Sequence, residues 1–198
     1  MSATACQRDL IRIGVLHGAT ELGSLRCKVE QSISGENGER RWQQHVEQIA
    51  SFWKECRTDV LALDLPWEQV VLFQDSMPVC AHPELIVRDL AARGSANYQL
   101  LEELTGKGAR LAGTESLDLL REEVSAAKSG RLTGALAEDL LARRDAFIAH
   151  TVDGALASGE IGLLFLGMAH DVRPYLPAGL RYWPSSDSYR NREPGNDA

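Results

Sequence analysis

The stretch IGLLFLGMAHDV, residues 161–172, is an unbroken run of apolar residues and glycine that leads into His170 and Asp171. Short apolar runs of this kind are typical of strands that are buried on both faces of a parallel sheet. A second run, IRIGVLHG at residues 11–18, ends in His17 in the same way. The two runs predict two core strands that each place an imidazole at the edge of a sheet.

Outward from these runs, the chain alternates apolar segments with helical patterns. EQVVLFQDSM at residues 68–77 and ARLAGTES at residues 109–116 predict two more strands, and LRYWP at residues 180–184 predicts a short fifth. Amphipathic patterns separate them, the longest running from about Gly134 to Leu156. This alternation predicts an α/β fold with a mainly parallel central sheet of four or five strands flanked by helices.

The length of 198 residues predicts one domain. We expect this α/β domain to span residues 1–184, with a helical insert around residues 40–107. The last segment, residues 185–198, is polar throughout and predicts a flexible tail.

The net charge of −7 excludes general binding to nucleic acid or to anionic membranes, which both need a basic surface. No apolar segment is long enough to span a bilayer, and the first residues lack the apolar core of a signal peptide. The four cysteines are far apart and form no metal-binding or redox pair (Cys6, Cys27, Cys56 and Cys80). We therefore expect a cytoplasmic protein with reduced thiols.

Polar or titratable side chains follow every one of the first four predicted strands. They are His17 and Glu21, then Gln74 and Asp75, then Thr114 and Glu115, and finally His170 and Asp171. Carboxyl ends of parallel strands meet at one edge of a sheet, where open α/β folds bind ligands. Imidazoles and carboxylates together form either a divalent-metal site or an acid–base site. The alternative is that these residues only hydrogen-bond at the edge of the core.

Arg144 separately indicates that charged groups meet at this edge of the sheet. It lies four residues after Leu140 and four before Ile148, on the apolar stripe of the longest predicted helix. A buried guanidinium needs an anionic partner. Arg144 therefore either reaches the strand-end carboxylates or an anionic ligand, or it extends its charged end to the rim while its stem packs.

The order of these motifs resembles the superfamily that contains TraB and GumN proteins, Tiki proteases, ChaN-like haem-binding lipoproteins and erythromycin esterases. The closing motif is carried by LGMAHDV, with Gly167 and His170, and the preceding helix by Arg144-Asp145, where the family usually has Arg-Asn. LAGTES resembles the middle motif and GVLHGATE, more loosely, the opening one. The stretches around Gln74-Asp75, GSANYQLL and GTES also resemble a bacterial group to which we attach no activity.

The resemblance implies a metal-assisted hydrolase site, or a small-ligand pocket, at the carboxyl edge of the sheet. We expect a peptide, ester or lactone substrate and a divalent cation (Mn, Co or Zn). The expected metal ligands are His17, Asp75, Glu115 and His170, and the expected catalytic residues are His17, Glu21, Glu115, Arg144 and His170. Two other classes stay open: a binding protein for an anionic or haem-like ligand, and an interaction subunit that uses the helical insert. A homodimer is also left open.

Overall fold

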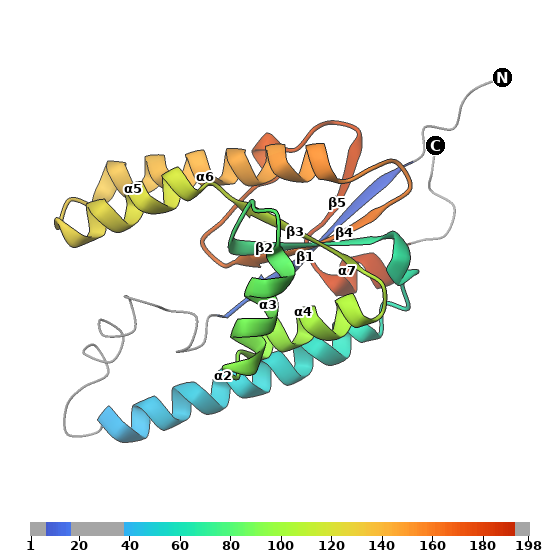
Figure 1. Ribbon diagram of the computed structural model, residues 1–198, viewed down its shortest axis with the longest axis horizontal. Coiled ribbons are helices and arrows are strands. Elements are labelled where there is room, and N and C mark those ends of the chain that lie inside the picture. Colours follow the sequence, from blue (N-terminus) through green and yellow to red (C-terminus); the bar gives the residue numbers. More distant parts are fainter. Residues whose placement is uncertain (1–6, 17–37, 193–198) are drawn as a thin grey trace.

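The computed structural model describes residues 7–16 and 38–192, and its centre is a five-stranded sheet (Figure 1). All strand pairs are parallel, and the strand order is β3-β2-β4-β1-β5. The strands are β1 (Arg8–Val15), β2 (Val70–Pro78), β3 (Arg110–Glu115), β4 (Ile161–Gly167) and β5 (Leu180–Trp183). The predicted α/β fold with a parallel central sheet is therefore confirmed.

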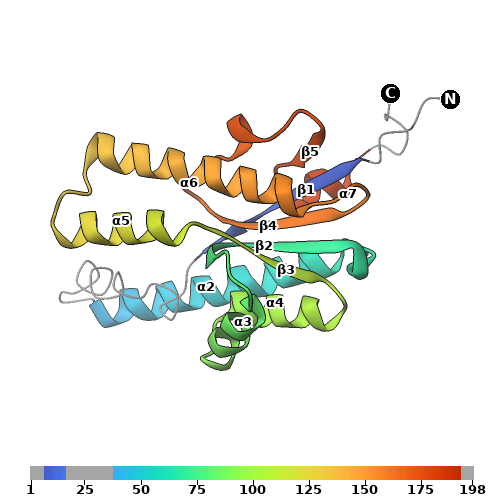
Figure 2. The same cartoon turned by 45° about the horizontal axis from the view of Figure 1, so that its top comes forward.

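Helices cover both faces of this sheet. In both views α5 and α6 lie on one side, and α2, α3 and α4 lie on the other (Figures 1 and 2). The helices are α2 (Gly38–Leu61), α3 (Pro83–Ala92), α4 (Ala96–Gly106), α5 (Leu117–Lys128), α6 (Gly134–Ala155) and α7 (Ser186–Arg190). Two short 3-10 turns complete the described elements, η2 (Trp67–Gln69) and η3 (Arg173–Tyr175).

Alternation along the central strands produces two apolar cores. In β2, Val70 and Leu72 belong to the core that includes residues of α2, α3 and α4, whereas Val71 and Phe73 pack on the side of α6. All four side chains are buried. Burial on both faces explains why the strand sequences are continuously apolar rather than alternating.

The end of β2 is irregular, and this irregularity affects where Asp75 lies. The register between β2 and β3 shifts between Gln74 and Pro78, and Ser76 has a φ of 64°. Gly113 on β3 makes room for the shift, because a Cβ atom there would lie 2.1 Å from the carbonyl oxygen of Pro78. Only glycine fits at this position without a backbone movement.

Two segments differ in structure from what the sequence predicted. Residues 40–107 contain helices α2, α3 and α4, but also β2, which lies between β3 and β4 in the sheet. Within the expected tail, α7 begins at a capping box on Ser185, and Tyr189 is buried and packs edge-on against Trp183 at 5.6 Å. The described part of this segment, residues 185–192, therefore contains a short helix with one buried aromatic side chain.

None of the helices within the described residues is long and apolar enough to cross a bilayer.

Candidate functional site

Three of the predicted residues meet at the carboxyl edge of the sheet. Asp75 lies on β2, Glu115 ends β3, and His170 follows β4 by three residues. One ligand atom from each lies within 4.8 Å of the others. Their side chains are 2%, 0% and 6% exposed. The predicted convergence of these side chains is present, because β2 is paired with both β3 and β4.

Arg144 joins this cluster from α6. Its Nε donates to Glu115 Oε2 at 3.1 Å and its Nη2 donates to Glu115 Oε1 at 2.5 Å. Nη2 also donates to Asp75 Oδ1 at 3.3 Å, and Nη1 donates to Glu123 Oε2 at 2.9 Å. Arg144 therefore reaches the strand-end carboxylates, which was one of the two possibilities for a buried guanidinium on this stripe. All three of its nitrogens are used by side chains of the protein itself.

The neighbouring Arg143 lies at the surface. It pairs with Glu122 at 2.9 Å, and both side chains are 44% exposed.

Burial lowers the pKa of Arg144. The hydrogen bonds and charge of Glu115 and the charge of Glu123 outweigh burial, so the pKa of Arg144 is raised. The guanidinium therefore stays charged and is a fixed cation inside the cluster.

Asp145, the next residue of α6, holds His170. Its Oδ1 lies 2.5 Å from His170 Nδ1, and its Oδ2 accepts the backbone N–H of Asp171 at 3.0 Å. Only when the ring is neutral does an imidazole that donates Nδ1–H to a carboxylate carry a lone pair on Nε2. This Nε2 faces Asp75, whose Oδ2 is 3.6 Å away.

Asp75 contacts both Arg144 and His170. Besides Arg144 and His170, it contacts the backbone of β4, since its Oδ2 accepts the N–H of Gly167 at 3.0 Å. Burial raises the pKa of Asp75. The charge of His170 and a hydrogen bond from Glu115 outweigh burial, so the pKa lies below its ordinary value. Asp75 is therefore the ionised member of the carboxyl pair.

Glu115 shows the opposite shift. Burial raises its pKa, the hydrogen bonds and charge of Arg144 lower it, and the nearby charge of Asp75 raises it again. The pKa of Glu115 lies above its ordinary value as a result. Two carboxyl groups that share a buried site cannot both ionise easily, and their pKa values move apart. Glu115 is the member of the pair that holds a proton more readily.

The remaining predicted residues do not join the cluster. His17 and Glu21 lie outside the described residues. Thr114 is buried and donates to the carbonyl oxygen of Gln74 at 2.8 Å, while Gln74 Nε2 donates to the carbonyl oxygen of Asp75 at 2.8 Å. Asp171 is exposed and pairs with Arg173 at 2.7 Å. For these residues, the alternative of hydrogen bonding at the edge of the core describes what is seen.

The donor set fits a divalent cation. Asp75, Glu115 and His170 offer two carboxylates and one imidazole, the mixture that Zn²⁺, Mn²⁺ and Co²⁺ accept. The contact of Asp145 with His170 is the outer-shell arrangement typical of a metal-binding histidine. Arg144 opposes a further positive charge, but its guanidinium already binds three carboxylates (Asp75, Glu115 and Glu123), and a fourth, Asp145, contacts His170.

Comparisons with protein-family models, with curated proteins and with solved structures gave no match to this chain. Any function assigned to the site rests on its own residues and on the motif resemblance.

Proposed function

We propose that this protein is a metal-assisted hydrolase whose site lies at the carboxyl edge of the sheet. The observation that supports it is the buried meeting of Asp75, Glu115 and His170, with their ligand atoms within 4.8 Å. A divalent cation held by Asp75 and His170 would lower the pKa of bound water to about 7 and polarise a carbonyl group. His17 and Glu21 remain predicted members of the site.

Glu115 is the group we assign to proton transfer. Burial raises the pKa of Glu115 above its ordinary value, which makes Glu115 the better proton acceptor of the two buried carboxyl groups. Water attacks the carbonyl carbon of the substrate and a new carbon–oxygen bond forms. The bond to the leaving nitrogen or oxygen breaks, and the proton taken by Glu115 passes to that leaving group. The products are an amine or alcohol and a carboxylic acid, which releases its remaining proton to solvent or to the amine and becomes a carboxylate.

Arg144 and Asp145 act by positioning in this scheme. Arg144 holds both carboxyl groups, since its guanidinium contacts Glu115 and Asp75 together. Asp145 fixes the ring of His170 so that Nε2 faces Asp75. The sequence also allowed Arg144 to reach an anionic ligand, and that role stays a prediction which a substrate complex would test.

The alternative functions find less support in the contacts. The fixed cation of the cluster, Arg144, is already bound by Asp75, Glu115 and Glu123, which disfavours an anionic ligand such as a haem propionate. A haem-like cofactor and an interaction role for the helices of residues 40–107 remain proposals from the sequence. So do a cytoplasmic location, a homodimer, a small-molecule or peptide substrate, and the absence of nucleic-acid binding.

Metal binding is the test of the proposal. Purified protein would be stripped with a chelator and titrated calorimetrically with Zn²⁺, Mn²⁺ and Co²⁺. Asp75→Asn and His170→Gln should each weaken the preferred metal by about tenfold or more, because each removes a ligand. His82→Gln is the matched control, since the side chain of His82 is 72% exposed at the start of α3.

Equal affinity in wild type, Asp75→Asn and His170→Gln would overturn the metal role, provided that both variants unfold like wild type in denaturant. If a metal binds, a screen of peptide and ester substrates is the next experiment. Glu115→Gln should abolish turnover while it keeps the fold, with Glu160→Gln as its control because Glu160 is part of an Arg110 ion pair away from the cluster.

A further inference from the structure

Arg12 on β1 is a half-buried cation without a carboxylate partner in the described chain. The other described arginines that are not exposed are Arg8, Arg144 and Arg181, and each of them binds an aspartate or a glutamate. Arg12 makes one hydrogen bond within the described residues, from Nη2 to the carbonyl oxygen of Gly167 at 3.4 Å. A guanidinium that is partly removed from water needs an anion, and the described chain supplies none to Arg12.

Asp171, in the loop after β4, is already bound by a different arginine. Arg173 donates to it through both Nε and Nη2, at 2.7 and 2.8 Å. Hydrogen bonds from Arg173 lower the pKa of Asp171 most, and the charge of Arg12 lowers it less. Asp171 therefore does not serve as the partner that Arg12 needs.

Tyr182 on β5 adds a second donor on the same face of the sheet. It is in register with Leu10, which belongs to the apolar core on the side of α6, and it packs against that core. Arg12 lies two residues after Leu10 and so faces the same side, with about 8 Å between its Cα atom and that of Tyr182. Burial raises the pKa of Tyr182, so the hydroxyl keeps its proton, and this hydroxyl makes no hydrogen bond within the described residues. A guanidinium and a hydroxyl that can both donate are suited to bind a carboxylate.

Gly167 connects Arg12 to the proposed active site. Its carbonyl oxygen accepts from Arg12 at 3.4 Å, and its N–H donates to Asp75 Oδ2 at 3.0 Å. The N and O atoms of one residue are at most about 3.6 Å apart, so the Arg12 guanidinium lies within about 10 Å of the Asp75 carboxylate. Because β5 ends at Trp183, in register with Ile11, no strand continues beside Arg12 within the described residues. One small molecule can therefore contact Arg12 and also reach Asp75.

We propose that Arg12 and Tyr182 bind a carboxylate of the substrate, and that the substrate is an amide whose nitrogen belongs to an amino acid with a free carboxylate, as at the carboxyl end of a peptide. The inference rests on the proposed hydrolase function and names its substrate class. In such a molecule the carboxylate carbon lies about 3–4 Å from the carbonyl carbon that water attacks. A polar contact of about 3 Å at each end covers the remaining distance between Arg12 and Asp75.

The reaction on this substrate follows the scheme of the proposed hydrolase. Water adds across the carbon–nitrogen bond, so the acyl part leaves as a carboxylic acid, and the nitrogen takes the proton held by Glu115 and leaves as the amine of a free amino acid. The proton of the carboxylic acid then passes to this amine or to solvent. Arg144 does not bind the substrate carboxylate in this arrangement, because Asp75, Glu115 and Glu123 already occupy its guanidinium.

Binding of a minimal acyl amino acid to metal-free protein tests the proposal without turnover. N-acetylglycine would be titrated into the chelator-treated full chain and followed by ligand-observed NMR, with N-acetylglycinamide as the matched uncharged probe. N-acetylglycine should bind about tenfold more tightly or more, because only the carboxylate pairs with a guanidinium. Arg12→Met should remove this difference between the probes. Tyr182→Phe should weaken N-acetylglycine by about threefold or more, since it removes one hydrogen bond.

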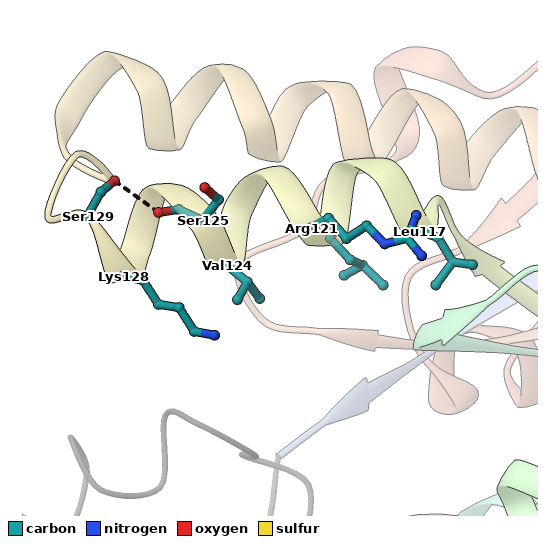
Figure 3. Close-up of a pocket in the computed structure, with 7 residues that line it drawn as sticks. Leu117, Arg121, Val124, Ser125, Lys128 and Ser129 are labelled. Atoms are coloured by element: carbon teal, nitrogen blue, oxygen red, sulfur yellow. Dashed lines mark hydrogen bonds between the residues drawn. The ribbon is translucent and has the colours of Figure 1, made fainter.

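Arg121→Met is the matched control for Arg12→Met. Figure 3 shows Arg121 on α5, where it lines a surface pocket, and its side chain is 74% exposed. This variant should keep the affinity for N-acetylglycine within about twofold of wild type. Thermal unfolding separates ligand binding from a structural role: Arg12→Met removes a half-buried charge and keeps a long side chain, so it should melt at or above the wild-type temperature.

The proposal is overturned if the two probes bind wild type equally, or if Arg121→Met weakens N-acetylglycine as much as Arg12→Met does. It is also overturned if Tyr182→Phe binds both probes as wild type does, a result that is readable even where Arg12→Met fails to fold. Metal binding that depends on His170, without a preference for the carboxylate probe, would reject only this substrate class. A carboxylate preference that depends on Arg12, without metal binding, would reject the metal-assisted mechanism and leave a carboxylate-binding site.

Discussion

Replacing Gly113 by alanine should destabilise the protein strongly, although it adds only one methyl group. The added Cβ would lie 2.1 Å from the Pro78 oxygen and 2.9 Å from the Met77 oxygen. A carbon and a carbonyl oxygen normally approach to about 3.3 Å, so the backbone of β2 must retreat by about 1.2 Å. Both obstacles are backbone atoms, and a change of side-chain rotamer cannot relieve them.

The size of the effect follows from what this movement disturbs. Overpacking of a tight interior costs about 1–3 kcal/mol, and the Val79 N–H bond to the Glu115 oxygen, now 3.0 Å, contributes about 1 kcal/mol. Alanine recovers about 0.4–1 kcal/mol by restricting the unfolded chain. The net loss is about 1–3.6 kcal/mol, or roughly 2–14 °C in melting temperature for a chain of this length.

Thermal unfolding followed by circular dichroism measures this directly. Gly154→Ala in α6 is the control, because a Cβ there meets no atom within 4 Å and alanine favours the helix. We expect the control to melt at or slightly above the wild-type temperature. If Gly113→Ala melts within about 2 °C of wild type, the two strands are not packed as tightly as described, and the account of the β2 irregularity is wrong.

Three further predictions concern the cluster. Arg144→Leu should lower the free energy of unfolding by about 3–5 kcal/mol in denaturant titrations, because it leaves buried carboxylates unpaired. Arg143→Leu should have a much smaller effect, because its ion pairs are exposed to solvent; equal losses would contradict the buried role. The folded state binds the Glu115 proton more tightly than the unfolded chain does, so this residue makes the free energy of unfolding fall as pH rises above about 4.5. Glu115→Gln should remove this contribution to the pH dependence of the free energy of unfolding. An unchanged pH profile in the variant would refute the assignment of the raised pKa to Glu115. Asp145→Asn should weaken metal binding by about tenfold, measured by calorimetry, because it loosens the orientation of His170; an unchanged affinity would show that the contact has no such role.

The strands and their polar ends could be predicted because burial on both faces leaves a direct mark on the sequence. A run such as IGLLFLG has few alternatives to a central parallel strand. No comparable pattern in the sequence predicts the order of the strands in the sheet. Asp75 and His170 meet because β2 is paired with β4, and that adjacency depends on how the crossovers pack rather than on any local pattern.

Asp145 was identified only as a departure from a motif, although its position held a signal. It lies four residues after Leu141 and three before Ile148, so it occupies an inward-facing position on α6 as Arg144 does. A carboxylate at such a position needs a donor, and the nearest candidate in the predicted sheet edge was the imidazole of His170. Glu123 was harder to find, because its helix is polar on several sides and 35% of its side chain remains exposed.

The two adjacent residues of α6 show how the fold and the candidate site depend on each other. Arg144 binds the carboxyl groups that end β2 and β3, and Asp145 binds the imidazole that follows β4. Consecutive residues of a helix point about 100° apart, so one turn of α6 can contact three strand ends only if the helix crosses the edge of the sheet where they meet. The same contacts that anchor α6 on the sheet therefore fix the geometry of the proposed active site, and a variant that loosens one should loosen the other.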